Sequence, residues 1–309
     1  MNNKKKILLI DSNSLIHRAF HALPPLANKK GEQLGAVYGF LLVFFKALKD
    51  IRPCYIAAAF DVKGPTFRHK EFDLYKAQRP KMDSDLVPQI PKVKKALKAF
   101  GVPVFEKKGF EADDIIGTIA KKISEENNDK ETETIIMSGD KDLFQLIGSN
   151  TKVYGLRKGV KDTVLYGVEE IKSKYEGLTP QQLVDFKGLR GDPSDNIAGV
   201  PGIGEKTGIK LIKKFGSLED MYEELEEKEE VEGVSKRIRE NILENKKEAF
   251  LSKKLVKIKC DVPLVFNLEK CSFGNYDRKK VEETFKEFEF NSLIKKIPEA
   301  GTQTRINFC

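Results

Sequence analysis

Histidine, cysteine and long apolar runs are scarce in this sequence of 309 residues. It has three His and four Cys, and no two cysteines form a C-x-x-C pair, so a zinc module of that kind is not expected. The longest apolar run, residues 39–45, is far shorter than the roughly 18 residues that cross a membrane. The apolar run before the first aspartate has only four residues, too few for a secretory signal. These absences argue against a membrane or secreted protein and predict a cytoplasmic one.

Charged residues, in contrast, are abundant. They make up 33% of the chain, hydrophobic residues make up 40%, and the formal net charge is +8. This length and composition suit one large globular domain or two modest ones, at about 100–200 residues per domain. The basic excess favours a polyanionic partner, although many ordinary soluble proteins are also basic.

Three short apolar runs read as buried strands, and each leads into an aspartate. Segments with apolar residues at helical spacing lie between them, which predicts an α/β fold with a mostly parallel sheet. The predicted strands are Lys4–Asp11, Cys54–Asp61 and Thr132–Asp142, and the predicted helices are Tyr38–Ile51, Val93–Phe100 and Asp113–Ile123.

Acidic side chains are therefore expected to meet at one edge of the sheet, since ligands bind at the carboxyl ends of parallel strands. Asp11, Asp61, Asp140 and Asp142 follow the strands, and the run 111–114 adds three acids at the start of a helix. Helix capping alone would explain one or two acids of that run, but not the three strands. Converging carboxylates without His or Cys predict a hard cation, Mg²⁺ or Mn²⁺, as in two-metal phosphoryl-transfer sites, with Ca²⁺ as the alternative.

A second feature is the segment Pro65–Pro91, where basic residues alternate with aromatic ones. That mixture suits a surface that follows a nucleic-acid backbone and stacks on bases, although an irregular solvated connection would have a similar composition. Its length and its position beside the predicted acidic edge favour a binding loop.

A third feature is the Gly/Pro hairpin Gly199–Gly208, which opens a helix. It matches neither a dinucleotide-binding fingerprint nor a P-loop. A helix–hairpin–helix turn remains, in which glycine lets backbone N–H groups approach a phosphate. The lysines that follow in the helix would add charge for a DNA backbone.

Together these residues resemble the bacterial 5′-nuclease family, which comprises the 5′→3′ exonuclease domain of DNA polymerase I, its stand-alone relatives and the similar flap endonucleases. The resemblance covers about residues 6–297 and is carried by LLIDSNSLIHRAFHAL, GAVYGF, FRH, YKAQRP, GFEADDIIGTIA, SGDKDLFQL and GDPSDNIAGVPGIGEKT. It implies a PIN-like nuclease core, a helical arch and a C-terminal helix-three-turn-helix subdomain. It also implies a structure-specific 5′→3′ exonuclease or flap endonuclease that acts in DNA replication and repair.

The resemblance assigns roles residue by residue. The metal-site acids are Asp11, Asp61, Glu111, Asp113, Asp114, Asp140, Asp142, Asp192 and Asp195. Lys76 and Arg79 would steer the scissile phosphate from the arch. The DNA-binding residues would be Arg68, Tyr75 (stacking on a base), Gly202, Gly204, Lys206, Thr207 and Lys210.

The resemblance also sets the expected organisation. We expect a core at residues 1–175 with the arch at about 65–91, a helical DNA-binding region at 176–260, and a C-terminal extension at 261–309 whose tail is loosely held. Two or more Mg²⁺ ions, replaceable by Mn²⁺, are expected, with K⁺ at the hairpin Gly202–Lys206. The expected partners are DNA with a 5′ flap, nick or 5′ end and a separate DNA polymerase. A stand-alone monomer without a membrane partner is expected.

Three other functions compete with this interpretation. A non-catalytic DNA-binding module would use the acids only as caps. A single-strand RNA nuclease would not need the hairpin that suits a duplex. A phosphatase on a doubly wound sheet would place aspartates at strand ends without needing either the hairpin or the arch.

Overall fold

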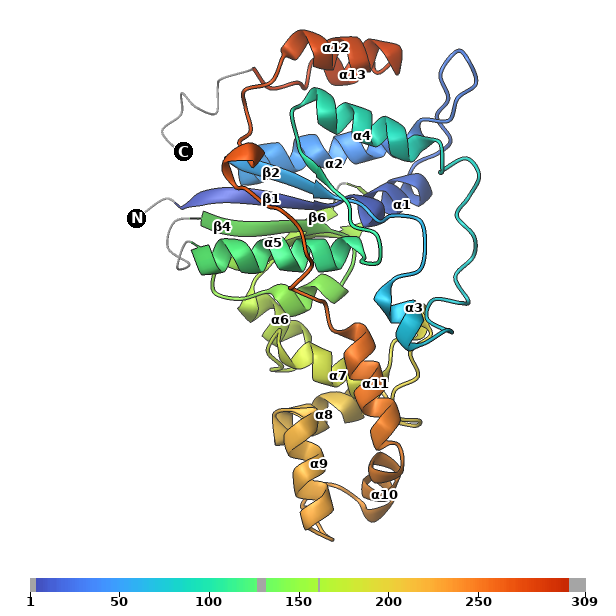
Figure 1. The fold of residues 1–309 in the computed structure, drawn as a ribbon, viewed down its shortest axis with the longest axis vertical. Helices are drawn as coiled ribbons and strands as arrows, with labels where there is room; N and C mark the ends of the chain where they lie inside the picture. Colours follow the sequence, from blue (N-terminus) through green and yellow to red (C-terminus); the bar gives the residue numbers. More distant parts are fainter. Residues whose placement is uncertain (1–3, 127–131, 161, 300–309) are drawn as a thin grey trace.

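The computed structural model describes residues 4–126, 132–160 and 162–299, and its centre is a mostly parallel sheet (Figure 1). Six strands lie in the order β3-β2-β1-β4-β5-β6. The strands are β1 Lys5–Asp11, β2 Tyr55–Ala59, β3 Val104–Phe105, β4 Thr132–Ser138, β5 Thr151–Lys158 and β6 Asp162–Tyr166. The α/β class and the three strands expected from the sequence are confirmed. The short β3 and the strands β5 and β6 were not anticipated.

The order in which successive strands are added to the sheet reverses at β1. This strand pairs in parallel with β2 on one side and with β4 on the other, while β6 at the far edge runs antiparallel to β5. The crossovers thus leave β1 in opposite directions along the sheet, and such a switch point opens a crevice at the carboxyl ends of the strands. The loops after β1, β2 and β4 all emerge at this edge.

Helices cover both faces of the sheet. The helices of this part are α1 Ser12–Ala22, α2 Gly35–Ile51, α3 Phe67–Glu71, α4 Gln89–Ala99, α5 Ala112–Glu126 and η1 Asp142–Leu146. In Figure 1, α2 and α4 lie above the sheet and α5 lies below it. Alternate residues of β1 serve the two layers, because successive strand side chains point to opposite faces. Leu8 and Ile10 join the cluster with α2 and α4, whereas Ile7 and Leu9 join the cluster with α5.

A helical region continues from the α5 side of the sheet to the end of the molecule drawn at the bottom of Figure 1. Its elements are α6 Val168–Lys174, α7 Gln182–Arg190, η2 Pro193–Asp195, α8 Glu205–Phe215, α9 Leu218–Glu227, α10 Lys236–Glu244 and α11 Lys246–Val256. Most of its buried apolar residues belong to the same cluster as those of α5, so the helical region is packed onto the core.

The chain then returns to the sheet through η3 Glu269–Cys271, α12 Arg278–Glu287 and α13 Asn291–Ile294. Phe273, Phe285 and Phe290 enter the cluster of α2 and α4. The tail that the sequence analysis expected to be loose lies mostly outside the described residues. None of the helices within those residues has the length and apolar character needed to cross a bilayer.

Candidate active site

Three aspartates stand where β1, β2 and β4 end, at the carboxyl edge of the sheet. Asp11 closes β1, caps α1 by accepting a hydrogen bond from the Ser14 N–H, and accepts another from the Ser138 hydroxyl at 2.5 Å. Asp61 follows β2 and accepts a hydrogen bond from the Ala112 N–H at 2.7 Å, at the first residue of α5. Asp140 follows β4. The parallel strands thus bring together acids that are far apart in the sequence.

The run at the start of α5 adds acids to the same edge. Glu111 and Asp113 line a cavity of about 20 Å³ together with Asp140, Asp142 and Asp195. Asp195 belongs to the short helix η2, so the helical region also contributes an acid. We call the eight acids that meet here the acidic edge: Asp11, Asp61, Glu111, Asp113, Asp140, Asp142, Asp192 and Asp195.

Burial and mutual repulsion make these carboxylates costly to ionise. Burial, together with the nearby charges of Asp140 and Asp61, raises the pKa of Asp11 to about 7. Burial likewise raises the pKa of Asp113 well above its ordinary value, with Asp11 and Asp140 adding to the effect. Burial and neighbouring acids also raise the pKa of Asp61. A cluster of this kind is stabilised by a cation that shares its charge.

The sequence analysis missed one such cation, Lys187 on α7. Its ammonium group, only 15% exposed, contacts Asp142 and lies 2.7 Å from Oδ2 of Asp192. Burial raises the pKa of Asp142 to about 7, and the Lys187 charge opposes that rise. Burial alone would also raise the pKa of Asp192, but the charge of Lys187 outweighs burial there and holds the pKa below its usual range. No motif in the sequence marks Lys187, because its contact with Asp142, 45 positions earlier, depends on how α7 packs beside η1.

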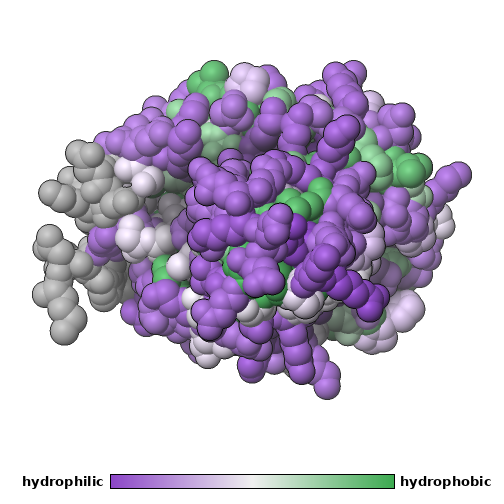
Figure 2. Space-filling model, turned by 90° about the horizontal axis from the view of Figure 1, so that it is seen from below, coloured by the Kyte–Doolittle hydropathy of each residue, from purple (hydrophilic) through white to green (hydrophobic). Residues whose placement is uncertain are grey.

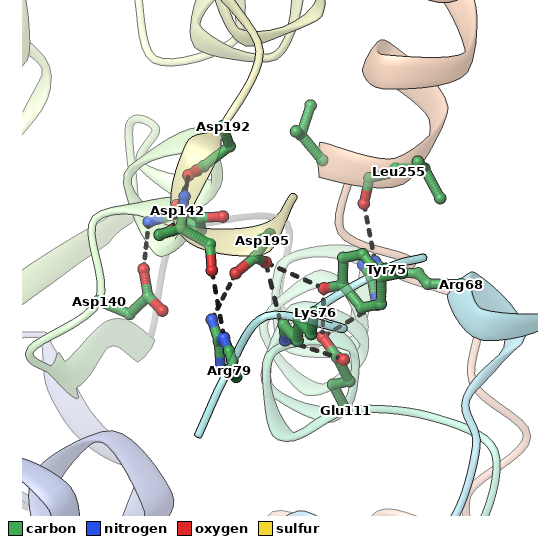
Figure 3. Close-up of polar contacts among 12 residues, drawn as sticks. Arg68, Tyr75, Lys76, Arg79, Glu111, Asp140, Asp142, Asp192, Asp195 and Leu255 are labelled. Carbon is green, nitrogen blue, oxygen red and sulfur yellow. Dashed lines mark hydrogen bonds and ion pairs between the residues drawn. The ribbon is translucent and has the colours of Figure 1, made fainter. Parts of the chain in front are cut away.

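The arch segment, residues 65–91, supplies two more cations to the acidic edge. Lys76 donates to Oε1 of Glu111 at 2.9 Å, and Arg79 pairs with Asp195 (Figure 3). Burial tends to lower the pKa of Lys76, but the charges of Glu111 and Asp195 outweigh it, so the pKa is raised and the ammonium stays charged. Lys76 and Arg79 therefore lie beside the acids, where the sequence analysis expected them to act.

Backbone contacts fasten the arch to the turn 193–196. The Lys76 N–H donates to the carbonyl of Asp195 at 2.9 Å, and the Asn196 side chain donates to the carbonyl of Leu74 at 2.8 Å. The backbone of Lys76 has φ +56°, a left-handed conformation that is unusual for a side chain of this kind. The arch thus lies closed over the acids.

Tyr75 does not have the place predicted for it. We expected an exposed ring stacking on a base, but the side chain is 3% exposed. Its hydroxyl lies 3.2 Å from Oε2 of Glu111 and 3.1 Å from Oδ2 of Asp195. In this closed arch Tyr75 is a buried partner of the acids, and a base cannot stack on it unless the arch moves.

Arg68 and Asp114 also require correction. Arg68, predicted to bind DNA, is 3% exposed and donates to both carboxylate oxygens of Asp114, at 2.8 and 2.9 Å. Asp114, predicted as a metal ligand, is fully buried, and its two oxygens also accept the N–H groups of Glu111 and Lys259. Four donors saturate this carboxylate. The pair ties the base of the arch to α5 and to the end of α11.

The acidic edge has the donor chemistry that suits a divalent metal. Within the described ranges, no group of three or more His, Cys, Asp or Glu side chains is arranged as a ready cage for an ion. Lys76, Arg79 and Lys187 lie among the acids and form ion pairs with four of them, namely Glu111, Asp195, Asp142 and Asp192. The donors are nevertheless all oxygen, which fits Mg²⁺, Mn²⁺ or Ca²⁺.

The Gly/Pro hairpin lies apart from these acids, at the start of α8. Gly202 has φ +77°, which favours glycine, and Gly204 caps the helix. A side chain at either position would meet nothing within 4 Å, so the backbone is open to a ligand. Exposed lysines, among them Lys206 and Lys210, follow on α8, and Thr207 is half-buried. The end of the molecule formed by the helical region is mostly hydrophilic (Figure 2).

Sequence comparisons agree with the resemblance described above. Residues 6–176 match the profile of the 5′-3′ exonuclease N-terminal resolvase-like domain, and residues 178–279 match that of its C-terminal SAM fold. The chain is 43% identical over 303 residues to DNA polymerase I of Bacillus subtilis (strain 168) and 41% identical over 300 residues to that of Bacillus caldotenax. These alignments cover 98% and 97% of this chain but 33% of each relative, so the chain spans about a third of their length.

Solved structures share the fold at low sequence identity. The T5 D15 protein co-crystallised with metal ions superposes with a TM-score of 0.65 at 18% identity, covering 95% of this chain and 100% of that one. The catalytic core of Rad2 in complex with DNA substrate gives a TM-score of 0.59 at 18% identity, covering 96% and 94%. Because the first family profile alone matches more than half of the residues, and the second continues from it, the chain belongs to the 5′-3′ exonuclease family.

Proposed function

We propose that the chain is a divalent-metal-dependent 5′→3′ nuclease that hydrolyses phosphodiester bonds near 5′ ends and 5′ flaps of DNA. The observation that carries this proposal is the acidic edge, whose buried carboxylates repel one another beside three basic side chains in a member of this family. The name of the relatives, DNA polymerase I, supports a role in DNA replication and repair.

The acids of the acidic edge would hold two or more Mg²⁺ ions, and Mn²⁺ would substitute. Such ions lower the pKa of a bound water and neutralise charge at the transferring phosphoryl group. Asp114 is not among the proposed ligands, since Arg68 and two N–H groups already occupy its oxygens.

Basic residues of the chain have two uses in this scheme. In the closed arch Lys76 and Arg79 neutralise Glu111 and Asp195. When the arch receives a 5′ strand, the same two side chains are placed to draw the scissile phosphate toward the acids and to stabilise the charge that develops on it. Products would be short 5′ fragments or mononucleotides that carry a 5′-phosphate.

The hairpin at Gly202–Lys206 would hold duplex DNA at the other end of the site. Its open backbone and the exposed lysines of α8 suit a phosphate backbone, and K⁺ bound at the turn would bridge the hairpin and a phosphate. We further propose that the protein acts as a cytoplasmic monomer, beside a DNA polymerase activity.

Cleavage of a 5′-labelled flap duplex tests the proposal. The assay compares Mg²⁺ with EDTA, and the wild type with Asp140→Ala and with Asp261→Ala, an exposed aspartate outside the acidic edge. We expect Mg²⁺-dependent products, no detectable cleavage by Asp140→Ala, and wild-type cleavage by Asp261→Ala. Product length separates flap cutting from exonucleolysis.

Two results would contradict the proposal. Near-normal cleavage by Asp140→Ala would remove the acidic edge from the chemistry. Tight DNA binding without cleavage, in Mg²⁺ or in Mn²⁺, would show a DNA-binding module instead.

A further inference from the structure

A pocket of about 450 Å³ opens between the acidic edge and the start of α8. Asp140, Asp142 and Asp192 line it at the acidic edge, and Glu205, the first residue of α8, lines it at the hairpin. The pocket therefore joins the two places where the proposed function puts DNA.

Four basic side chains also line this pocket, and we call it the basic pocket. Lys141, Lys174 and Arg190 line it in addition to Lys187. Lys187 is committed to two acids, whereas in the part of the chain that the structure describes the other three basic side chains form no ion pair. Arg190 is held in place by Phe186, with its guanidinium 5.9 Å from the ring centre.

The Tyr175 hydroxyl adds a neutral donor to the basic pocket. Burial raises the pKa of Tyr175, and among the charges that act on the hydroxyl are those of Lys187, Glu205 and Arg190, which places it among the charged groups of the pocket. Its ring packs against Phe186 at 6.1 Å between centres. Over the described residues the Tyr175 hydroxyl has no hydrogen-bond partner, yet it is not among the fully buried unpaired groups, so it is open to a ligand in the pocket.

An ammonium, a guanidinium and a hydroxyl around one polar pocket are the donors that bind phosphate oxygens. Acids at both ends of the pocket would repel such a ligand, but Lys187 neutralises part of the charge at the acidic edge, and the other three basic side chains of the lining outnumber Glu205. The proposed function supplies a polyanion that runs from the acids to the hairpin.

We propose that the basic pocket binds the sugar-phosphate backbone of the DNA on the duplex side of the cleavage site, with Lys174, Tyr175 and Arg190 as the donors. This inference rests on the proposed function for the direction in which the DNA lies. It adds a subsite for the phosphodiester backbone of the duplex, placed between the acids and the hairpin.

The test is DNA binding by Lys174→Gln/Tyr175→Phe, measured in EDTA with a 5′-flap duplex. Both substitutions keep the size of the side chain, and Lys174 is exposed, so the fold is preserved. The matched control is Lys270→Gln/Tyr38→Phe. Lys270 lies on η3 beside the opposite end of β2, and Tyr38 lines a groove with Phe288 and Phe290.

We expect Kd to rise about five- to tenfold in the pocket variant and to stay unchanged in the control. The slope of log Kd against log salt should fall by about 0.9, because one phosphate contact to a cation is lost. A neutral methylphosphonate placed at each of the first three linkages on the duplex side should weaken binding to the wild type. The same substitutions should have little further effect on the pocket variant.

Three outcomes overturn the inference. One is wild-type binding that ignores these methylphosphonates, and another is a pocket variant that remains as sensitive to them as the wild type. The third is a variant that loses affinity for inorganic phosphate but binds DNA normally, which would show a site for free phosphate.

The assay is independent of cleavage. Binding as expected, in a protein that does not cleave with Mg²⁺, would overturn the proposed function and leave the basic pocket standing. Normal cleavage by the wild type, together with a pocket variant that binds DNA like the wild type, would support the proposed function and overturn the role of the basic pocket.

Discussion

Removing the Lys187 ammonium should change the stability of the protein in a way that depends on pH and on Mg²⁺. In Lys187→Met the side chain keeps an unbranched stem, but Asp142 and Asp192 lose the cation that they share. The three groups are 13–21% exposed, so water screens the loss only in part.

The expected size follows from the chemistry of the two acids. Deleting one partner of a buried ion pair costs about 3–5 kcal/mol. Because burial raises the pKa of Asp142 to about 7, a proton can replace the ammonium in mildly acidic solution. We therefore expect a loss of about 3 kcal/mol near pH 8, or roughly 6–10 °C in Tm, and about 1 kcal/mol near pH 5.5.

Thermal unfolding at both pH values, with Mg²⁺ and with EDTA, measures the effect. Mg²⁺ should stabilise Lys187→Met more than the wild type, because the ion no longer competes with an ammonium for the same oxygens. Lys253→Met is the control. Lys253 is 18% exposed and pairs with Asp185 and Glu219 at 2.5 Å, outside the acidic edge. It should lose stability that Mg²⁺ does not restore, and equal behaviour of the two variants would refute the reasoning.

Three further predictions concern the same edge. The pKa values of Asp11 and Asp142, raised by burial to about 7, lie above those of the unfolded chain, so the folded protein holds extra protons. Without metal, its Tm should fall as pH rises from about 5 to 8 while Mn²⁺ binding tightens, and pH-independent Mn²⁺ affinity by calorimetry would contradict this. Arg68→Met should cost about 3–5 kcal/mol in urea unfolding because Asp114 is left buried and unpaired, and a stable variant with weakened DNA binding would restore the DNA-contact role. Gly199→Ala should lower the Tm by several degrees, since φ is +66° and a Cβ would lie 2.3 Å from a backbone nitrogen, and an unchanged Tm would show that the turn has another conformation.

The acidic edge was predictable from the sequence because its determinants are local. A buried strand is a short apolar run, and in a parallel sheet all carboxyl ends share one side. Asp11, Asp61 and Asp140 follow from that rule alone. That rule does not predict that Asp113 faces the acidic edge while its neighbour Asp114 is buried against Arg68. Adjacent helical residues point about 100° apart, and the partner of Asp114 depends on how distant segments pack.

The roles of two arch residues were wrongly predicted for a similar reason. The guanidinium of Arg68 is fixed by the carbonyls of Leu255 and Lys257 at the end of α11, almost two hundred positions along the chain. Composition marks such a residue as a surface cation, and only tertiary packing shows that it is buried. Tyr75 was misjudged for the same reason, because its acidic partners are Glu111, just before α5, and Asp195 in η2.

The closed arch has a consequence for how the protein would respond to ions. Asp195 holds Arg79 and the Lys76 backbone, and it is also a proposed ligand. An ion and the arch therefore compete for one carboxylate, and their binding equilibria are linked. By reciprocity, an ion that loosens the arch by some factor is itself bound more tightly, by that same factor, when a DNA strand lifts the arch away. The arrival of substrate would thus load the metal site.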